Sequence, residues 1–399
     1  MSPRGRFTAL LVADIASALG SRVSLVAIPW LVLVTTGSAS DTGLIAAAEM
    51  VPYLLSSTLL TPLADRLGLR VSSVLCDLVS AVAMAGIAAF PHAGFGWLSL
   101  LVAVAGGLRG VGDRAKHVLL RPAALLAGYP LLRVTALYEG LTRLVTLLGS
   151  PLAGLLIVVS GAQGAIWVDA ASFGWCALLV AGLVADVPAE DGREPYRTAL
   201  AGGFRYLRGD RVLSGMLGTV FMLNLFANAA TLVFIPVWAR DVLHSPEALG
   251  LALGAFAGGA LLGTLVFTIV AERLPRYPTF LLGALISGAP RLFAIGLSGT
   301  LAVVLVVSVL AGFGIAAVNP ILGVAMYERV PDALQTRVIG LCTTVSFTGI
   351  PIGALAGGWA VTEFGLRQSL LVAGGLCLAV NLIPLLGARR VSLAPAAPA

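Results

Sequence analysis

The sequence predicts an all-α integral membrane protein whose twelve transmembrane helices form two pseudo-symmetric six-helix bundles. Hydrophobic residues make up 58% of the 399 residues and charged residues only 11%, and the mean hydropathy is +0.99. A soluble domain carries about 25% charged residues. Apolar segments long enough to cross a bilayer core of about 30 Å recur along the chain. Motifs of the first half also return in the second half, as expected for an internal repeat.

Each predicted span is an apolar segment bounded by charged or turn-forming residues. Several are longer than a perpendicular helix needs, so we expect them to tilt. The first segment follows Arg4 and Arg6, as a signal peptide would, but it is too long and has no clear small-residue cleavage site. We therefore interpret it as the first span. The predicted spans cover residues 7–35, 42–63, 71–91, 96–113, 134–160, 163–185, 212–239, 247–270, 278–298, 300–326, 338–361 and 366–387.

The basic residues predict that both termini are cytoplasmic. With the N-terminus inside, 19 of the 25 basic residues fall in cytoplasmic segments, Lys116 among them. Only Arg240 and Arg367 fall in outer loops, and four lie inside spans. Because short cytoplasmic loops are rich in Lys and Arg, this asymmetry predicts a multi-pass protein of the plasma membrane in that orientation. The location of these residues in short loops argues against nucleic-acid binding.

The longest predicted connection divides the chain into halves. Its second part places Tyr196, Leu200, Phe204 and Leu207 on one helical face, which is typical of an amphipathic helix at a membrane surface. The predicted parts are a six-helix bundle at 1–185, a cytoplasmic linker at 186–211, and a six-helix bundle with a short disordered tail at 212–399.

Three matches between the halves occur in the same order at offsets of 200 to 207 residues. They indicate two bundles related by an axis along the membrane normal. The matches are Asp65-Arg66-Leu67 with Glu272-Arg273-Leu274, Arg133-Val134 with Arg337-Val338, and Gly149 and Pro151 with Gly349 and Pro351.

The segment "TPLADRLGLR", residues 61–70, resembles the "GxLaDRxGRR" signature of the major facilitator superfamily. It departs from that pattern at Thr61 and Leu69, which puts the packing role of the first glycine in doubt. In that family the motif latches the inner gate. Independently of the family, Gly68 permits a left-handed turn, and a carboxylate at the end of a span can face a helix N-terminus. The residues that match, and that the resemblance assigns to the inner gate, are Leu63, Asp65, Arg66, Gly68 and Arg70.

Two further motifs resemble members of the same superfamily. The run Gly149-Ser150-Pro151-Leu152-Ala153-Gly154 is similar to the "GPxxGG" motif of its antiporters, with the proline one place late. Arg109 resembles the arginine of "RxxQG", but no glutamine follows. The segments "LRGVGDRAKHVLLRPAAL" and "IWVDAASF" resemble the drug:proton antiporter branch that includes macrolide-efflux and siderophore-export proteins. The resemblance implies export by alternating access, with an antiporter role for Gly149, Pro151 and Gly154.

Ionisable residues inside the predicted spans are candidates for proton coupling, because each costs about 2.5–3.5 kcal/mol at bilayer depth. Arg22 and Glu49 lie roughly 22 Å and 20 Å from the inner surface, so we predict an ion pair between them. Asp14 lies close in depth to Arg109, and we predict that it carries the proton. For each of these residues, a fixed ion pair that only holds helices together is the alternative.

The other intramembrane charges fit structural roles better. We expect fixed pairs for Asp77 and for Glu139 with Arg143, and a capping or buttressing role for Asp169. Arg291 has no evident partner in the sequence.

Aromatic and amide side chains are candidates for a substrate cavity. Asn224 and Asn228 are one turn apart with Phe221 nearby, although a hydrogen bond between helices would explain them equally well. Trp30 and Tyr53 could supply an aromatic wall, and Trp30 could equally anchor the helix at the membrane interface.

No catalytic constellation is present, so we predict that the protein is not an enzyme and uses no cofactor or metal. Its three histidines are scattered in or near loops, its four cysteines lie in apolar segments, and no Walker loop occurs. The predicted function is proton-coupled efflux of amphiphilic small molecules of the drug or antibiotic type. Export of a siderophore, a lipid or another endogenous metabolite is the alternative; an importer or a non-transporting receptor on the same fold remains open. The expected partners are the substrate, protons and the bilayer, and we expect a monomer.

Overall fold

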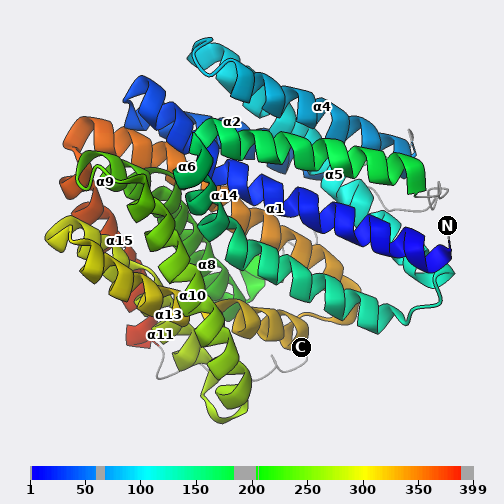
Figure 1. Ribbon diagram of the computed structural model, residues 1–399. Helices are drawn as coiled ribbons and strands as arrows, with labels where there is room; N and C mark the ends of the chain where they lie inside the picture. The colour runs from blue at the N-terminus through cyan, green and yellow to red at the C-terminus, as the bar shows by residue number, and fades with distance from the viewer. Residues whose placement is uncertain (1, 60–67, 184–203, 205, 388–399) are drawn as a thin grey trace. The chain divides into compact units, whose positions relative to one another are not determined.

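The structure is a computed structural model that describes residues 2–59, 68–183, 204 and 206–387 (Figure 1). All regular elements in these ranges are helical. The chain forms two compact units, which are described separately here. The first comprises residues 1–191 and 245–250, and the second comprises residues 192–244 and 251–399.

The first unit is built from long helices, and in it α1 packs along α6 while α5 packs against both α2 and α4 (Figure 1). Ser2 caps the start of α1 with its side chain, and Gly37 ends that helix in a left-handed conformation. The longest helix is two helices joined at Gly161, which has a φ of 73°. The bounds are α1 Pro3–Thr36, α2 Ala39–Leu59, α4 Leu69–Ala89, α5 Phe95–Leu126 and α6 Leu131–Leu183.

In the second unit two of the predicted spans are interrupted. One passes through the π-helix η1, and another breaks at Gly288 before the π-helix η3. The first residues of α10 belong to the first unit. The bounds are α8 Arg211–Ala229, η1 Ala230–Phe234, α9 Ile235–Asp241, α10 Pro246–Val270, η2 Ala271–Arg273, α11 Arg276–Ser287, α12 Ala289–Phe293, η3 Ala294–Ser298, α13 Leu301–Arg329, α14 Asp332–Phe364 and α15 Leu366–Gly387.

Every predicted span is largely helical over its described residues, with exceptions at residues 90, 91, 288 and 300. Nine segments of the described chain are long and apolar enough to cross a membrane. One of them, residues 133–183, contains the two spans that meet at Gly161. Together with α2 and α15, these segments account for the twelve predicted spans. Most of the predicted linker lies outside the described residues, but residues 206–209 are helical.

The predicted end of the fourth span is wrong. We expected it to stop at residue 113, before a charged segment, but α5 continues to Leu126. The helix continues because Ala115, Leu119 and Leu120 keep one apolar face that is buried in the bundle. As a result Lys116 is completely buried in a helix and does not lie in a cytoplasmic loop.

Equivalent glycines make equivalent helix contacts in the two units. A Cβ atom on Gly149 of α6 would lie 2.4 Å from Cβ of Arg22 on α1. The matching Gly349 of α14 approaches α8 in the same way, since its Cβ would lie 2.7 Å from the carbonyl oxygen of Phe221. The fifth span of each half therefore packs closely against the first, in support of two equivalent six-helix arrangements.

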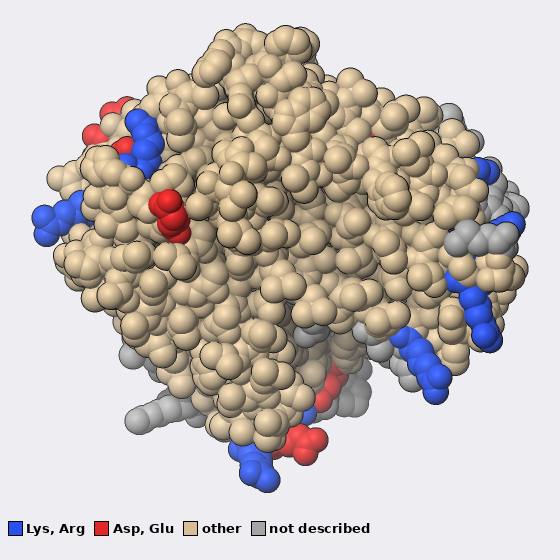
Figure 2. All heavy atoms as spheres, viewed as in Figure 1, with Lys and Arg blue, Asp and Glu red and all other residues tan. Residues whose placement is uncertain are grey.

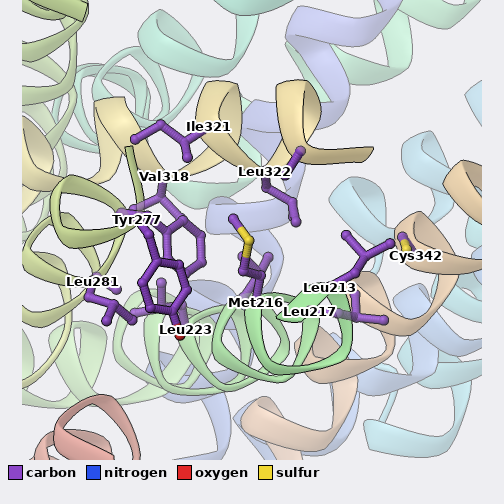
Figure 3. Packing of buried hydrophobic residues seen from close by; sticks show 14 of the residues in the cluster. Leu213, Met216, Leu217, Leu223, Tyr277, Leu281, Val318, Ile321, Leu322 and Cys342 are labelled. Atoms are coloured by element: carbon purple, nitrogen blue, oxygen red, sulfur yellow. The ribbon is translucent and has the colours of Figure 1, made fainter. Parts of the chain in front are cut away.

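The cores and surfaces of the helices are both apolar. In the second unit Leu213, Met216 and Val318 are buried together where α8 and α13 pack (Figure 3). Large side chains such as Val159 and Ile269 are about three-quarters exposed. On the face drawn in Figure 2, charged side chains are sparse and lie toward its margins. Such a surface suits contact with lipid rather than with water.

Candidate transport site

Close packing of α5 on α2 positions the central charged pair of the first unit. A Cβ atom on Gly106 would lie 2.3 Å from the carbonyl oxygen of Glu49, and one on Gly110 would lie 2.5 Å from that of Tyr53. Only glycine allows the two backbones to approach so closely. Arg109 lies between these glycines on α5, so its side chain reaches the acidic and aromatic residues of α2.

Glu49 and Arg109 form a buried ion pair. Nη1 of Arg109 lies 2.7 Å from Oε1 of Glu49, and the two side chains are 6% and 0% exposed respectively. Cζ of Arg109 also lies 5.2 Å from the ring centroid of Tyr53. Oε2 of Glu49 and Nε of Arg109 are buried without a hydrogen-bond partner, so the pair is only partly satisfied. A partly satisfied pair is easier to rearrange than a closed network.

The predicted pairing of Glu49 with Arg22 is wrong. The predicted end of the fourth span placed Arg109 too close to the inner surface, whereas in the longer α5 it lies level with Glu49 and pairs with it. Arg22 packs its aliphatic carbons against Gly149 and is exposed, and it forms no ion pair with any described residue. The carboxylate of Glu49 is paired with Arg109 instead.

A second charged cluster surrounds Lys116, a residue that the hydropathy pattern placed in a cytoplasmic loop. Nζ of Lys116 lies 3.1 Å from Oδ1 of Asp77 and 3.5 Å from Oδ1 of Asp113. The ammonium also donates to the hydroxyl of Ser17 at 3.2 Å. Gly112, one turn before Lys116, allows the close approach to α4 on which Asp77 lies. In the sequence, Gly112 one turn before the single lysine, Lys116, was the feature that could have indicated this close helix contact.

Asp14 belongs to this second cluster. It is 5% exposed and interacts with the hydroxyl of Tyr138, and Lys116 is the basic residue that acts on it most strongly. Its predicted neighbour, Arg109, is instead paired with Glu49. We call Asp14, Asp77, Asp113, Lys116 and Tyr138 the inner cluster. Asp77 and Asp113 contact the ammonium group of Lys116, and Asp14 lies near it without an ion pair to any described residue, so Asp14 can hold a proton without leaving Lys116 unpaired.

Asp169 is a further buried acid, held by a hydroxyl group. Ser172 donates to its Oδ1 at 3.3 Å. A Cβ atom on Gly20 would lie 2.5 Å from Oδ1 of Asp169. Its side chain is fully buried, at the contact between α1 and α6. The contact fits the expected buttressing role.

Of the motif at residues 61–70, the structure describes residues 68–70. Gly68 has a φ of 87°, which confirms the left-handed turn before α4. Arg70 donates a hydrogen bond to the carbonyl oxygen of Ala181 on α6. The inner-gate candidates Asp65 and Arg66 lie outside the described residues.

The residues of the antiporter-like motif lie in one helix. Gly149 accommodates the side chain of Arg22, and Pro151 lies in the interior of α6. A Cβ atom on Gly154 would lie 2.1 Å from Cα of Gly250, which belongs to the same unit. Each of the two glycines thus faces a neighbouring segment at a distance that a larger residue would not permit.

The candidate substrate residues lie in both units, with Phe221, Asn224 and Asn228 on α8 and with Trp30 and Tyr53 on α1 and α2. The amide of Asn224 donates to the carbonyl oxygen of Ser346 at 3.0 Å, which is the hydrogen bond between helices that we weighed as the alternative. Asn228 donates to the carbonyl of Asn224. Phe221 lies on α8 beside Gly349. Trp30 lines a pocket of about 410 Å³ in the first unit, together with His92.

The candidate spans, the repeated helix contacts and the charges buried inside the bundles together define a polytopic membrane transporter. The sequence profile of the Major Facilitator Superfamily matches residues 10–245 and 217–398. The chain therefore belongs to the Major Facilitator Superfamily, as the motifs predicted. Among the described residues, no group of three His, Cys, Asp or Glu side chains is arranged to hold a metal ion.

Curated relatives include exporters. The chain is 30% identical to the multidrug efflux pump Tap of Mycobacterium tuberculosis, over 99% of this chain and 97% of that protein. It is 32% identical to the enterobactin exporter EntS of Escherichia coli, over 59% of this chain and 58% of that protein. A solved structure of the nucleoside transporter NupG covers 97% of this chain with a TM-score of 0.78 and 12% identity, and all of that chain is matched. This last likeness concerns the fold alone.

Proposed function

We propose that this protein is a secondary active transporter that exports amphiphilic small molecules in exchange for protons. Two exporters of the superfamily, one described as a multidrug efflux pump, are its relatives. The observation that carries the proton coupling is the inner cluster, in which three carboxyl groups surround one buried lysine. Such an excess of acid at bilayer depth is costly unless one carboxyl group takes up a proton.

Asp14 is the proposed proton carrier. Glu49 and Asp77 each have a cationic partner within 3.1 Å, whereas Asp14 has no ion pair with any described residue. Within the inner cluster, Asp14 is therefore the acid whose charge is least compensated. Protonation of Asp14 would leave Lys116 to Asp77 and Asp113, and loss of the proton would draw Lys116 toward Asp14. Each arrangement favours a different packing of α1, α4 and α5, which is how a proton can bias alternating access.

The remaining features are proposed in supporting roles. Asp65, Arg66 and Arg70 would hold the inner gate closed, and Gly149, Pro151 and Gly154 would keep the fifth span closely packed. Both termini would lie in the cytoplasm of a monomeric protein of the plasma membrane. Phe221, Asn224, Asn228, Trp30 and Tyr53 remain candidates for substrate contact.

Transport by everted membrane vesicles tests this function. Wild-type vesicles should accumulate a fluorescent amphiphilic dye when a pH gradient is imposed, and a protonophore should abolish the accumulation. Asp14→Asn mimics the protonated carboxyl, so this variant should bind the dye and exchange it downhill but fail to accumulate it. Asp169→Asn, at a buried acid outside the inner cluster, is the matched control and should still accumulate it. Wild-type accumulation by Asp14→Asn would assign the carrier elsewhere.

An endogenous metabolite is the second candidate for the substrate, because one relative is a siderophore exporter by name. Deletion of the gene should then lower secretion of a native metabolite into the medium, measured by mass spectrometry. Unchanged secretion, with dye export intact, would favour the drug-type substrate.

A further inference from the structure

Arg291 is a buried cation that has no acidic partner among the described residues. It is 4% exposed, and its Nε and Nη2 atoms are buried with no hydrogen-bond partner in the described chain. It lies within the candidate span 276–298, about 22 Å along that span from Arg276. A guanidinium remains charged in any protein environment, so burial cannot remove this charge by deprotonation.

The surroundings of Arg291 are aromatic. Its Cζ atom lies 4.8 Å from the ring centroid of Phe256 on α10. The acidic residues of the described part of the second unit lie at or next to a helix end, whereas Arg291 lies well inside its span. These acidic residues are Asp210, Asp241, Glu272, Glu328, Asp332 and Glu363.

The internal repeat shows that Phe256, beside Arg291, stands where the first unit has a carboxylate. A Cβ atom on Gly106 would meet the carbonyl oxygen of Glu49, and one on Gly312 would lie 1.9 Å from that of Phe256. The two contacts are offset by 206 and 207 residues, which agrees with the offset of the repeated motifs. Phe256 thus occupies in the second unit the place that Glu49 occupies in the first. In the first unit this place holds a carboxylate paired with Arg109 of α5, and in the second unit it holds a ring beside Arg291 of α12.

We propose that Arg291 binds the anionic group of an amphiphile, and that molecules combining an acid with an apolar body are therefore a substrate class. A carboxylate would accept charge-assisted hydrogen bonds from the free guanidinium nitrogens, and Phe256 would pack against the adjoining apolar part. This inference rests on the proposed export function and narrows its substrates. An anionic lipid headgroup offers the same chemistry, and the test separates it from a free acid.

The test uses dansylaminoundecanoic acid and its methyl ester, which differ in charge but hardly in apolar surface. The purified full-length protein in neutral detergent should bind the acid about tenfold more tightly than the ester. Arg291→Met should remove this preference while ester binding persists, and Arg291→Lys should retain part of it. Equal loss of acid and ester binding, or an unchanged preference in Arg291→Met, would overturn the proposal.

A second pair of variants covers the possibility that Arg291→Met does not fold. Phe256→Glu places a carboxylate where the first unit has Glu49, so it should pair with Arg291, raise the melting temperature and abolish the preference for the acid. Phe256→Gln is the matched uncharged control and should keep the preference. An unaltered preference in Phe256→Glu contradicts the proposal.

The source of the anion is distinguished by repeating the binding measurement in nanodiscs. Competition for the acid by added phosphatidylglycerol, together with no transport of the acid, would assign the site to lipid and overturn the substrate class. Export of the neutral dye by the same variants in vesicles measures the general function separately. Failure of the anion site would leave that export intact, whereas failure of the proposed function would remove it in the wild type.

Discussion

The ion pair between Glu49 and Arg109 joins α2 to α5 and leaves one nitrogen and one oxygen unsatisfied. Removing one partner strands the other charge in a low dielectric, which costs about 3–5 kcal/mol for buried pairs. Glu49→Gln or Arg109→Met alone should therefore lower the melting temperature in detergent, measured by tryptophan fluorescence. The double variant Glu49→Met with Arg109→Met should recover most of the loss. A double variant as unstable as both single variants combined would contradict this account of the pair.

Asp210 makes stability depend on pH at the start of α8. Its carboxylate accepts hydrogen bonds from the backbone N–H groups of Val212 and Leu213, and Nε of Arg329 lies 2.7 Å away. Burial alone would raise the pKa of Asp210, but Arg329 and the two N–H donors outweigh burial and hold this pKa below its usual value. The stabilisation is therefore complete above the unfolded pKa of about 3.9 and is lost as the pH falls through the lower folded pKa.

This dependence can be measured as thermal stability between about pH 3 and 7. Asp210→Asn should lose at least about 1 kcal/mol at neutral pH, because a charged cap is weakened, and its stability should change less below about pH 4. Asp241→Asn, in a more exposed pair with Arg240, is the control and should change stability by less than about 1 kcal/mol. Identical pH profiles for wild type and Asp210→Asn would show that this carboxylate does not titrate with unfolding.

At the scale of the helix, glycines set which faces meet. Gly106→Ala should force α5 away from α2, since its Cβ would lie 2.3 Å from a backbone oxygen that cannot rotate aside. Gly174→Ala on α6 has no heavy atom within 4 Å of its Cβ and is the matched control. We expect Gly106→Ala to lower the melting temperature and to disturb the Arg109 pair. The control should be neutral, or more stable by up to about 1 kcal/mol. Equal melting temperatures would contradict the packing argument.

The same glycines explain which parts of the site the sequence could predict. The cost of burying a charge directed attention to Asp14, Glu49 and Arg109, of which Glu49 and Arg109 pair with each other. Depth along a helix could not tell which face each occupies, so the Glu49 partner was assigned to Arg22. Gly106 and Gly110 carried that information, because small residues one turn apart mark a close helix contact.

Lys116 shows a second reason why the sequence did not predict the whole site. Hydropathy falls where charges cluster, so the segment after residue 113 was interpreted as a loop. The helix instead continues through Asp113 and Lys116, because the acids on α1 and α4 compensate the lysine. Partners contributed by distant helices are invisible in a local window, and for that reason the inner cluster emerged only from the fold.

At the scale of the whole molecule, the helices and their repeat were predictable because a bilayer leaves few alternatives to apolar helices. The orientation remains a prediction from the basic residues. A reporter fused near Arg197 should read cytoplasmic and one near His244 should read external, by alkaline phosphatase and green fluorescent protein activity. Fusions at both sites should be expressed at similar levels as a control. The opposite reading at either site would contradict the predicted topology.

The central claim is that substrate export is exchanged for a proton held by Asp14. The most direct measurement is proton release when substrate binds to the purified full-length protein in weakly buffered detergent, followed with a pH indicator. The account predicts that saturating substrate releases protons from the wild type and from Asp169→Asn, and that Asp14→Asn binds the substrate without releasing them. Substrate binding to the wild type with no proton release, or the same release from Asp14→Asn, would contradict it.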